Sequence, residues 1–293
     1  MRDNADTRVW LRYPYRRPLA DLQLFCFPFA GGGASAFRKW GTKLPGNVEL
    51  CAIQLPGRED RLLEPPFRQV GPLVNALSEA VSPEKPFVFF GHSMGALLAF
   101  ELCRRLRRLE ARHPAHLFVS GFRAPHLPDR KAPTYDLPDA SFLEKLRRLS
   151  GTPDEVLQSG ELMTVFMPAL RADFALTETY SYVHEMPLEC SVSAFVGSDD
   201  QEVNDDEIAA WSQHTTGSFS LQKIPGDHFF LLREGQSQLL RAMSDQLSQL
   251  IGTLQRQGGP IRPAVGGAFP PVRLSRKTEE QDDASATGKQ PER

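Results

Sequence analysis

The sequence lacks the features that would direct it into or across a membrane. No apolar run approaches the ~20 residues that a helix needs to span a bilayer. The first 17 residues mix arginine, aspartate and asparagine, without the apolar stretch of a secretory signal peptide. These absences predict a cytoplasmic protein without a membrane partner.

An excess of charge and a metal-binding pattern are also missing. With 34 lysines and arginines against 36 aspartates and glutamates, the formal net charge is −2, so we expect no nucleic-acid partner. The four cysteines are scattered through apolar segments without the spacing of metal ligands. We therefore predict buried thiols in a reducing compartment and no metal site.

What the sequence does contain is a regular alternation of apolar segments. Short apolar runs typical of buried strands fall at residues 22–28, 48–55, 86–90, 117–120, 192–196 and 219–224. Segments with helical spacing fall at residues 34–44, 70–81, 96–109, 206–214 and 231–254. This alternation predicts an α/β fold, with a mostly parallel central sheet flanked by helices.

Two ends and one insertion interrupt the alternation. Residues 1–20 are polar and are predicted to form an N-terminal arm that lies on the main domain, residues 21–255. Residues from about 124 to 188 show no obvious strand, which predicts an all-helical lid on the catalytic side. Residues 256–293 have too few apolar side chains to offset the ordering entropy, so we predict a disordered tail.

The most informative stretch is Gly91-His92-Ser93-Met94-Gly95, which fits the pattern G-x-S-x-G. It follows a predicted strand and precedes a predicted helix. A serine in such a turn has a strained backbone and an exposed hydroxyl at the top of a sheet. The flanking glycines are required because the chain turns too tightly for side chains. This context predicts Ser93 as a nucleophile.

A serine hydroxyl needs a base to take its proton, and the base needs an orienting carboxylate. In this fold the acid and then the histidine follow the serine along the chain. His228 follows the last predicted strand and is the predicted base, whereas His214 lies at the end of a helix before that strand. The acid should follow the preceding strand, where Asp200 is preferred and Asp199 is the alternative.

The oxyanion of a tetrahedral intermediate needs two backbone N–H donors. One is expected from Met94 and the other from the turn Phe29-Ala30-Gly31-Gly32-Gly33, where we prefer Ala30. No Gly-Lys-Ser/Thr follows these glycines, which argues against a phosphate loop. An acyl pocket is expected from Phe29 and apolar lid residues, namely Met163, Phe166, Met167 and Phe174. Packing of the lid onto the body is the alternative role for the lid residues.

Longer motifs around these residues resemble the type II thioesterases, the stand-alone thioesterases of polyketide, nonribosomal peptide and fatty acid synthases. The resemblance covers almost the whole body, and its most specific segments are Gln54-Leu55-Pro56-Gly57-Arg58-Glu59 and Leu170-Arg171-Ala172-Asp173. It implies an α/β-hydrolase that cleaves acyl thioesters from the phosphopantetheine arm of acyl or peptidyl carrier proteins. Such an enzyme removes aberrant or stalled acyl groups or releases product.

The resemblance also implies site residues and a partner. Ser93, Asp200 and His228 match the family's triad, and the amides of Met94 and Ala30 match its oxyanion donors. It implies no cofactor beyond the phosphopantetheine on the carrier, and we expect a monomer. Many bacterial members have histidine at the position of Phe29 in this chain, so a polar role is missing there.

Three alternatives remain at the level of sequence. A carboxylesterase or lipase would use the same triad. A carrier-protein acyltransferase can carry a similar G-x-S-x-G turn, here called the serine elbow. A noncatalytic carrier-binding protein would need no triad. The arginines at positions 104, 105, 107 and 108 could dock an acidic carrier protein. A solvated helix face is the other reading of such a run.

Overall fold

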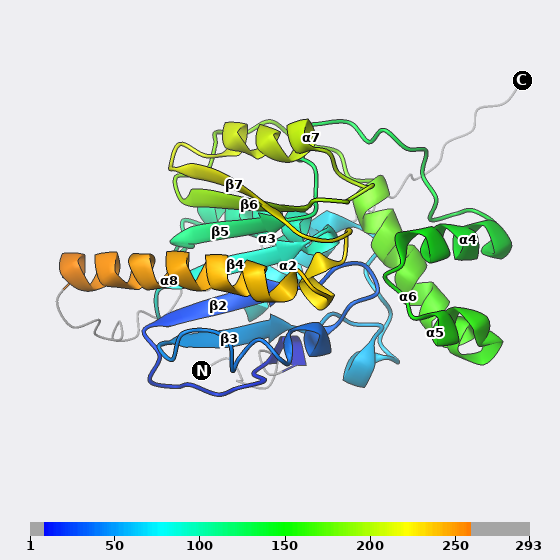
Figure 1. Ribbon diagram of the computed structural model, residues 1–293, viewed down its shortest axis with the longest axis horizontal. Coiled ribbons are helices and arrows are strands. Elements are labelled where there is room, and N and C mark those ends of the chain that lie inside the picture. Colours follow the sequence, from blue (N-terminus) through cyan, green and yellow to red (C-terminus); the bar gives the residue numbers. More distant parts are fainter. Residues whose placement is uncertain (1–8, 259–293) are drawn as a thin grey trace, which may run out of the picture. The chain divides into compact units, whose positions relative to one another are not determined.

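The computed structural model describes residues 9–258 and contains a seven-stranded sheet with the order β1-β3-β2-β4-β5-β6-β7 (Figure 1). All neighbouring strands are parallel except β1 and β3. The strands are β1 Leu11–Arg12, β2 Leu22–Phe27, β3 Val48–Ile53, β4 Phe87–His92, β5 His116–Ser120, β6 Ser191–Gly197 and β7 Phe219–Ile224. The predicted mostly parallel sheet is confirmed.

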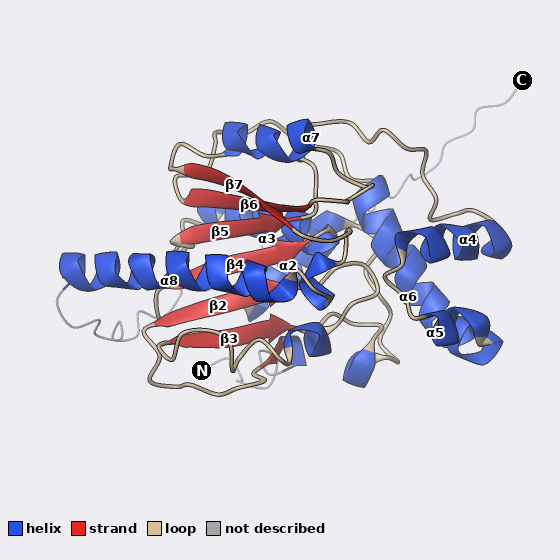
Figure 2. Ribbon diagram, in the orientation of Figure 1, coloured by secondary structure: helices blue, strands red, loops and turns tan. Residues whose placement is uncertain are grey.

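Helices cover both faces of the sheet (Figure 2). One face packs against α2 (Val70–Ala80), α3 (Met94–Arg108) and α7 (Asp205–Ala209) with the 3₁₀ helix η3 (Ala210–His214). The other packs against α8 (Gln236–Gly258). Successive strand residues alternate between these two layers. Because both faces are covered, every residue of β3 and β4 is buried, and their sequences are nearly continuous apolar runs.

The predicted lid is present between β5 and β6. It consists of α4 (Asp139–Leu149), α5 (Asp154–Gln158) and α6 (Gly160–Glu178), and it has an apolar core of its own. Residues 124–188 contain no strand, apart from an isolated bridge between Leu188 and Thr215. The lid lies beyond one end of the strands in Figure 1.

The register of the sheet brings the predicted site segments together. Phe27, at the end of β2, pairs with Gly91, so the glycine-rich turn leaves the sheet beside the serine elbow. Gly197, at the end of β6, pairs with Ile224, so the loops after β6 and β7 also leave side by side. The carboxyl ends of parallel strands therefore collect all these loops at one edge.

The N-terminal arm is part of the sheet rather than a polar segment lying on it. Strand β1 lies within the predicted arm, and Leu11 is buried against the core. The Arg17 guanidinium donates to backbone carbonyls of Gly41 and Pro45 at 2.7 and 2.6 Å. A two-residue strand is too short to show alternation, which is why the sequence pattern missed it.

The helix predicted at residues 34–44 is instead the 3₁₀ helix η1 (Ala34–Phe37) followed by turns. The backbone amide of Trp40 donates to the Phe37 carbonyl, and the backbone amide of Lys43 donates to the Trp40 carbonyl. Each acceptor lies three residues before its donor. A 3₁₀ turn places residues three apart on the same side, so Phe37 and Trp40 are both buried. An α-helix gives nearly the same spacing, so the apolar pattern does not distinguish a 3₁₀ helix from an α-helix here.

The C-terminal boundary also differs from the prediction. Helix α8 continues to Gly258, past the predicted domain end at residue 255. The rest of the predicted tail lies outside the described residues, as do residues 1–8 of the arm. Two further 3₁₀ helices, η2 (Glu59–Arg61) and η4 (Phe230–Leu232), complete the described elements.

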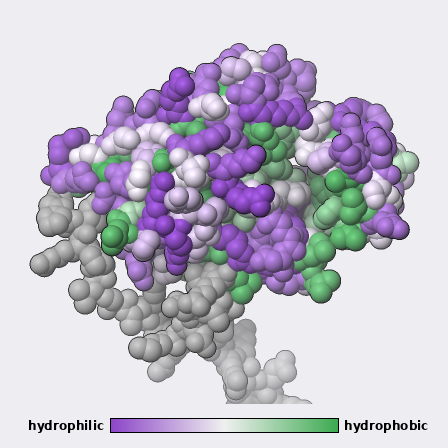
Figure 3. Space-filling model, turned by 60° about the horizontal axis from the view of Figure 1, so that its bottom comes forward, coloured by the Kyte–Doolittle hydropathy of each residue, from purple (hydrophilic) through white to green (hydrophobic). Residues whose placement is uncertain are grey.

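The surface in Figure 3 is mostly hydrophilic, with hydrophobic residues in separate groups. The exposed large apolar side chains of the described part include Leu19, Leu63 and Met186. No helix among the described residues combines the length and apolar character needed to cross a membrane. Three of the four cysteines, Cys26, Cys51 and Cys103, are buried, and all four are free thiols.

Candidate active site

The serine elbow connects β4 directly to α3. Ser93 has φ 52° and ψ −123°, a conformation that costs a non-glycine residue roughly 1–3 kcal/mol. Its amide donates to the Ser120 carbonyl at 2.7 Å, and its carbonyl accepts from the Ala96 amide at 2.9 Å. These bonds hold the strained turn and leave the Ser93 side chain at the start of α3.

Two glycines make this turn possible. A Cβ on Gly91 would lie 2.1 Å from the Gly95 carbonyl oxygen, and a Cβ on Gly95 would lie 2.2 Å from the Phe27 carbonyl oxygen. No side chain fits at such distances, so the close approach of elbow, helix and β2 requires glycine. The prediction that side chains would clash at both positions is confirmed.

The structure brings His228 and Asp200 together. The distance between His228 Nδ1 and Asp200 Oδ2 is 2.8 Å, and the Asp200 side chain has no exposed surface. The other carboxylate oxygen of Asp200 accepts from the amides of Glu202 and Val203, at 2.8 and 3.3 Å. These backbone donors fix the carboxylate in its orientation toward the imidazole.

The alternative acid and base lie elsewhere. The Asp199 carboxylate accepts from Ser198 Oγ at 2.8 Å and makes no hydrogen bond to His228. His214 is buried in the α3 layer, with its Nε2 2.7 Å from Nδ1 of His126. Geometry therefore separates Asp200 from Asp199, a choice that the sequence left open.

A second histidine, His92, which was not among the predicted site residues, lies beside His228. The two ring centroids are 5.1 Å apart, and His92 Nδ1 lies 2.8 Å from Ser120 Oγ. Burial, and then the neighbouring His228, hold the pKa of His92 well below its usual value. His92 is therefore neutral near pH 7 and adds no positive charge beside the imidazole of His228.

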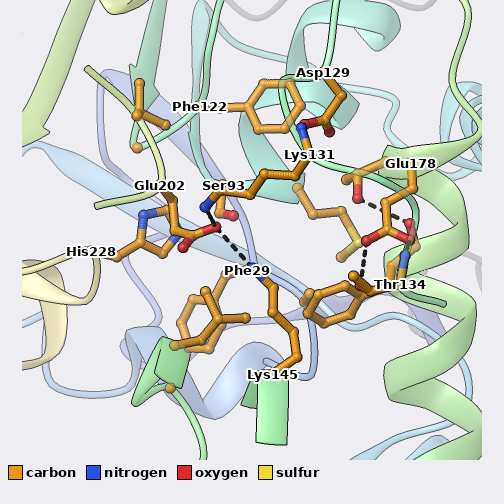
Figure 4. Close-up of a pocket in the computed structure, with 18 of the residues that line it drawn as sticks. Phe29, Ser93, Phe122, Asp129, Lys131, Thr134, Lys145, Glu178, Glu202 and His228 are labelled. Atoms are coloured by element: carbon orange, nitrogen blue, oxygen red, sulfur yellow. Dashed lines mark hydrogen bonds and ion pairs between the residues drawn. The ribbon is translucent and has the colours of Figure 1, made fainter. Parts of the chain in front are cut away.

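Ser93 and His228 line one cavity of about 140 Å³ beneath the lid, where Figure 4 shows their side chains next to one another. Ala30 and Met94 line the same cavity. Within residues 9–258, no group accepts a hydrogen bond from the amide of Ala30 or of Met94. Both N–H groups can therefore donate to a ligand in the cavity.

The predicted acyl-pocket residues divide into two sets. Phe29 and Phe174 line the cavity. Met163, Phe166 and Met167 do not, because they pack in the lid's own core against α4 and α5. The apolar stripe of α6 thus mainly holds the lid together, and the prediction that these three residues line the pocket is not supported.

Charged residues line the cavity where apolar ones were expected. Glu202 Oε2 lies 2.7 Å from Lys131 Nζ and 3.1 Å from Lys145 Nζ, and all three residues line the same cavity as Ser93 and His228 (Figure 4). Burial alone would raise the pKa of Glu202, but the two lysines hold it below its usual value. These residues are far apart in the sequence and formed no motif that could have shown them.

The arginine run on α3 is largely occupied within the chain. Arg104, Arg107 and Arg108 all contact the Glu185 carboxylate. Burial opposes the ionisation of Glu185, yet the arginines lower its pKa to about 2. The run clamps the loop that follows α6, which favours a structural role over a free docking patch. The described residues contain no cluster of histidine, cysteine and acidic groups that could hold a metal.

Comparisons with known proteins give a consistent result. A family model described as thioesterase domain matches residues 22–247. The gramicidin S biosynthesis protein GrsT of Aneurinibacillus migulanus is 45% identical over 230 residues, covering 78% of this chain and 90% of GrsT. RedJ, a thioesterase from the prodiginine biosynthetic pathway in Streptomyces coelicolor, superimposes with a TM-score of 0.74 at 40% identity, covering 77% of this chain and 90% of RedJ. BorB, a type II thioesterase from the borrelidin biosynthetic cluster, gives a TM-score of 0.74 at 36% identity, covering 82% and 98%.

Proposed function

The chain belongs to the thioesterase family, and on that premise we propose that it hydrolyses acyl thioesters on the phosphopantetheine arm of acyl or peptidyl carrier proteins. The observation that carries the proposal is one cavity lined by Ser93, by His228 with Asp200 hydrogen-bonded behind it, and by two backbone N–H groups that have no acceptor within residues 9–258. The similarity to RedJ and BorB supports a biosynthetic synthase as the partner. Removal of aberrant or stalled acyl groups, or release of product, is the proposed role.

The first half-reaction transfers the acyl group to the enzyme. Ser93 Oγ attacks the thioester carbon while Nε2 of His228 takes the hydroxyl proton. Asp200 accepts from Nδ1–H and stabilises the imidazolium that forms. The amides of Met94 and Ala30 donate to the oxyanion of the tetrahedral intermediate. Cleavage of the C–S bond then releases the carrier thiolate, which takes the proton from His228.

The second half-reaction returns the enzyme to its starting state. His228 removes a proton from water, which attacks the ester carbonyl of the acylated Ser93. The same two amides hold the second oxyanion, and collapse releases the carboxylic acid as His228 gives its proton back to Ser93 Oγ. This chemistry requires no metal or cofactor of the protein's own, because the phosphopantetheine arrives with the carrier.

The cavity also bears on the size of the acyl group. Its volume of about 140 Å³ is small beside the several hundred Å³ of a typical ligand pocket, and Lys131, Lys145 and Glu202 make one side polar. We propose that short or polar acyl groups are preferred to long alkyl chains. The Glu202 ion pairs must open before a long chain can enter.

The proposal is tested by incubating the purified protein with carrier proteins loaded with acyl groups of different length, and with the matching acyl-coenzyme A. Release is followed by mass spectrometry, with Ser93→Ala as the control. We expect Ser93-dependent hydrolysis that is faster on carrier-linked than on coenzyme-linked groups. Higher activity on nitrophenyl esters than on any thioester would instead identify a carboxylesterase.

A further inference from the structure

The two most specific motifs of the sequence contribute nothing to the triad, yet their charged ends meet. Arg58 Nη1 lies 2.5 Å from Asp173 Oδ2, and Arg58 Nη2 lies 2.9 Å from Asp173 Oδ1. The side chains are only 6% and 1% exposed. A bidentate pair with so little solvent contact fixes the relative positions of its two segments.

Both partners of this ion pair also bind the glycine-rich turn at residues 29–33, here called the oxyanion turn. Asp173 Oδ2 accepts from the Gly31 amide at 2.7 Å, and Arg58 Nη1 donates to the Gly32 carbonyl at 3.3 Å. A glycine run has no side chains to hold it, so these bonds restrain a segment with high backbone freedom.

The restraint reaches the proposed oxyanion donor through the backbone. The Gly32 amide donates to the Phe29 carbonyl at 2.9 Å. That carbonyl shares a planar peptide unit with the N–H of Ala30, so fixing one fixes the direction of the other. Asp173 and Arg58 bind the Gly31 amide and the Gly32 carbonyl on either side of the Gly32 amide, so the pair restrains the peptide unit that carries the Ala30 N–H.

The remainder of the first motif holds the chain just after the turn. Gln54 Oε1 accepts from the Ala34 amide at 2.9 Å, and Glu59 Oε1 accepts from the amide and hydroxyl of Ser35 at 3.1 and 2.6 Å. A Cβ on Gly33 would lie 2.3 Å from Glu59 Oε1. The motif thus clamps the turn from one side, while Asp173 holds it from the other.

We propose that Arg58 and Asp173 are positioning residues for the oxyanion hole, and that Asp173 makes α6 of the lid a structural part of it. This inference rests on the proposed function, because Ala30 is assigned as a donor there. Leu170 also contacts the turn, with its Cδ2 2.6 Å from the place of a Gly31 Cβ. Hence the end of α6 that carries Leu170 and Asp173 stays on the body during turnover, and access opens through other parts of the lid.

Substitutions of the pair separate positioning from mere stability. Asp173→Asn presents an NH₂ group either to Gly31 or to Arg58, so one donor faces another donor. Arg58→Met leaves a buried carboxylate without its cation. Because removal of one oxyanion donor costs about 10²–10³ in kcat, we expect misdirection of one donor to lower kcat roughly 10- to 100-fold with little change in KM. Arg58→Lys keeps the positive charge but cannot make the bidentate contact, so we expect its kcat to lie between those of the wild type and Arg58→Met.

The measurements are chosen not to depend on the natural substrate. Acyl trifluoromethyl ketones react with Ser93 to form a tetrahedral adduct whose oxyanion occupies the oxyanion hole. The inhibition constant of these ketones should therefore rise by the same factor as kcat falls. The rate of Ser93 labelling by a fluorophosphonate should fall in parallel. Arg104→Met is the matched control, because it removes a buried guanidinium from the Glu101 pair, remote from the turn. It should lower the unfolding temperature but leave labelling unchanged.

The double variant Arg58→Met with Asp173→Leu decides between the two roles. Replacing a buried ion pair by apolar side chains often restores stability, but it gives the Gly31 amide no acceptor. Recovery of the unfolding temperature without recovery of kcat or labelling supports the proposal. Recovery of all three, or labelling within twofold of wild type in folded single variants, overturns it. A wild type that is labelled but hydrolyses no thioester refutes the proposed function and leaves this test intact.

Discussion

Exchange of Asp200 for asparagine tests the proposed triad most directly. In the wild type the amides of Glu202 and Val203 donate to Asp200 Oδ1. In Asp200→Asn the side-chain carbonyl oxygen can take this place and accept the same two hydrogen bonds. The new NH₂ group then faces Nδ1 of His228, where the wild type has a carboxylate oxygen at 2.8 Å. Nδ1 must therefore act as an acceptor, the imidazole proton moves to Nε2, and His228 can no longer take a proton from Ser93.

The size of the effect follows from this change of tautomer. An asparagine in place of the triad acid lowers kcat by about 10⁴ when the site geometry survives, which corresponds to about 5 kcal/mol at 1.36 kcal/mol per tenfold. The change is nearly isosteric and the site is closed to solvent on the Asp200 side. We therefore expect KM to change little. Steady-state hydrolysis of an acyl thioester at pH 8, with folding checked by circular dichroism, gives the value.

Asp199→Asn is the matched control. Asp199 is exposed, and within residues 9–258 its carboxylate accepts only from the neighbouring Ser198 hydroxyl. We therefore expect kcat within about twofold of the wild type, as for a surface change. If Asp199→Asn lost more activity than Asp200→Asn, the assignment of the acid would be wrong. A folded Asp200→Asn enzyme with more than about a tenth of wild-type kcat would also refute the tautomer argument.

Three further changes test the elbow, a buried histidine remote from the triad, and the ion pairs that line the cavity. Gly95→Ala places a Cβ 2.2 Å from the Phe27 carbonyl oxygen, so we expect a loss of about 1–3 kcal/mol in urea unfolding, and an unchanged midpoint would contradict the geometry. Burial, and then the neighbouring positive groups, lower the pKa of His214 to about 4. In the unfolded chain the pKa of this histidine is about 6.5, so the unfolded chain takes up the proton first as the pH falls. The free energy of unfolding should therefore decrease by about 3 kcal/mol between pH 6.5 and 4. His214→Phe should reduce this pH dependence, and a pH dependence equal to that of the wild type would contradict the assignment. Replacing both Lys131 and Lys145 by alanine should raise the ratio of kcat/KM for a long acyl chain to kcat/KM for an acetyl group. The increase should reach about fivefold at most, because partly exposed ion pairs contribute about 0–1 kcal/mol. An unchanged ratio would show that the ion pairs do not limit entry.

The sequence was sufficient for the central strands of the sheet because these strands are buried on both faces. An apolar run such as β4 has no other stable environment, and the order of the strands then placed His228 and Asp200 at one edge of the sheet. The elbow was equally clear, because a Cβ on either of its glycines would lie within 2.2 Å of a backbone carbonyl oxygen. The catalytic roles of Ser93, Asp200 and His228 stay predictions until the variants are measured.

The parts that the sequence could not provide depend on contacts between distant segments. Arg58 and Asp173 are 115 residues apart, and their motifs showed that they were distinctive without showing that they touch. Helical periodicity marked the apolar stripe of α6 but could not say that Met163 packs against α4 and α5 rather than the cavity. The lysines around Glu202 had no pattern at all, since charged residues on loops have no periodicity.

Strand β1 has a practical consequence for shortened versions of the chain. It pairs Leu11 with Ile53 and Arg12 with Ala52, and so covers the outer edge of β3, all of whose residues are buried. A truncation that began at residue 21 would expose a row of unpaired N–H and C=O groups on an apolar strand. Such an edge is a template for pairing between molecules. Aggregation during expression, rather than loss of activity, is the failure we expect from that truncation.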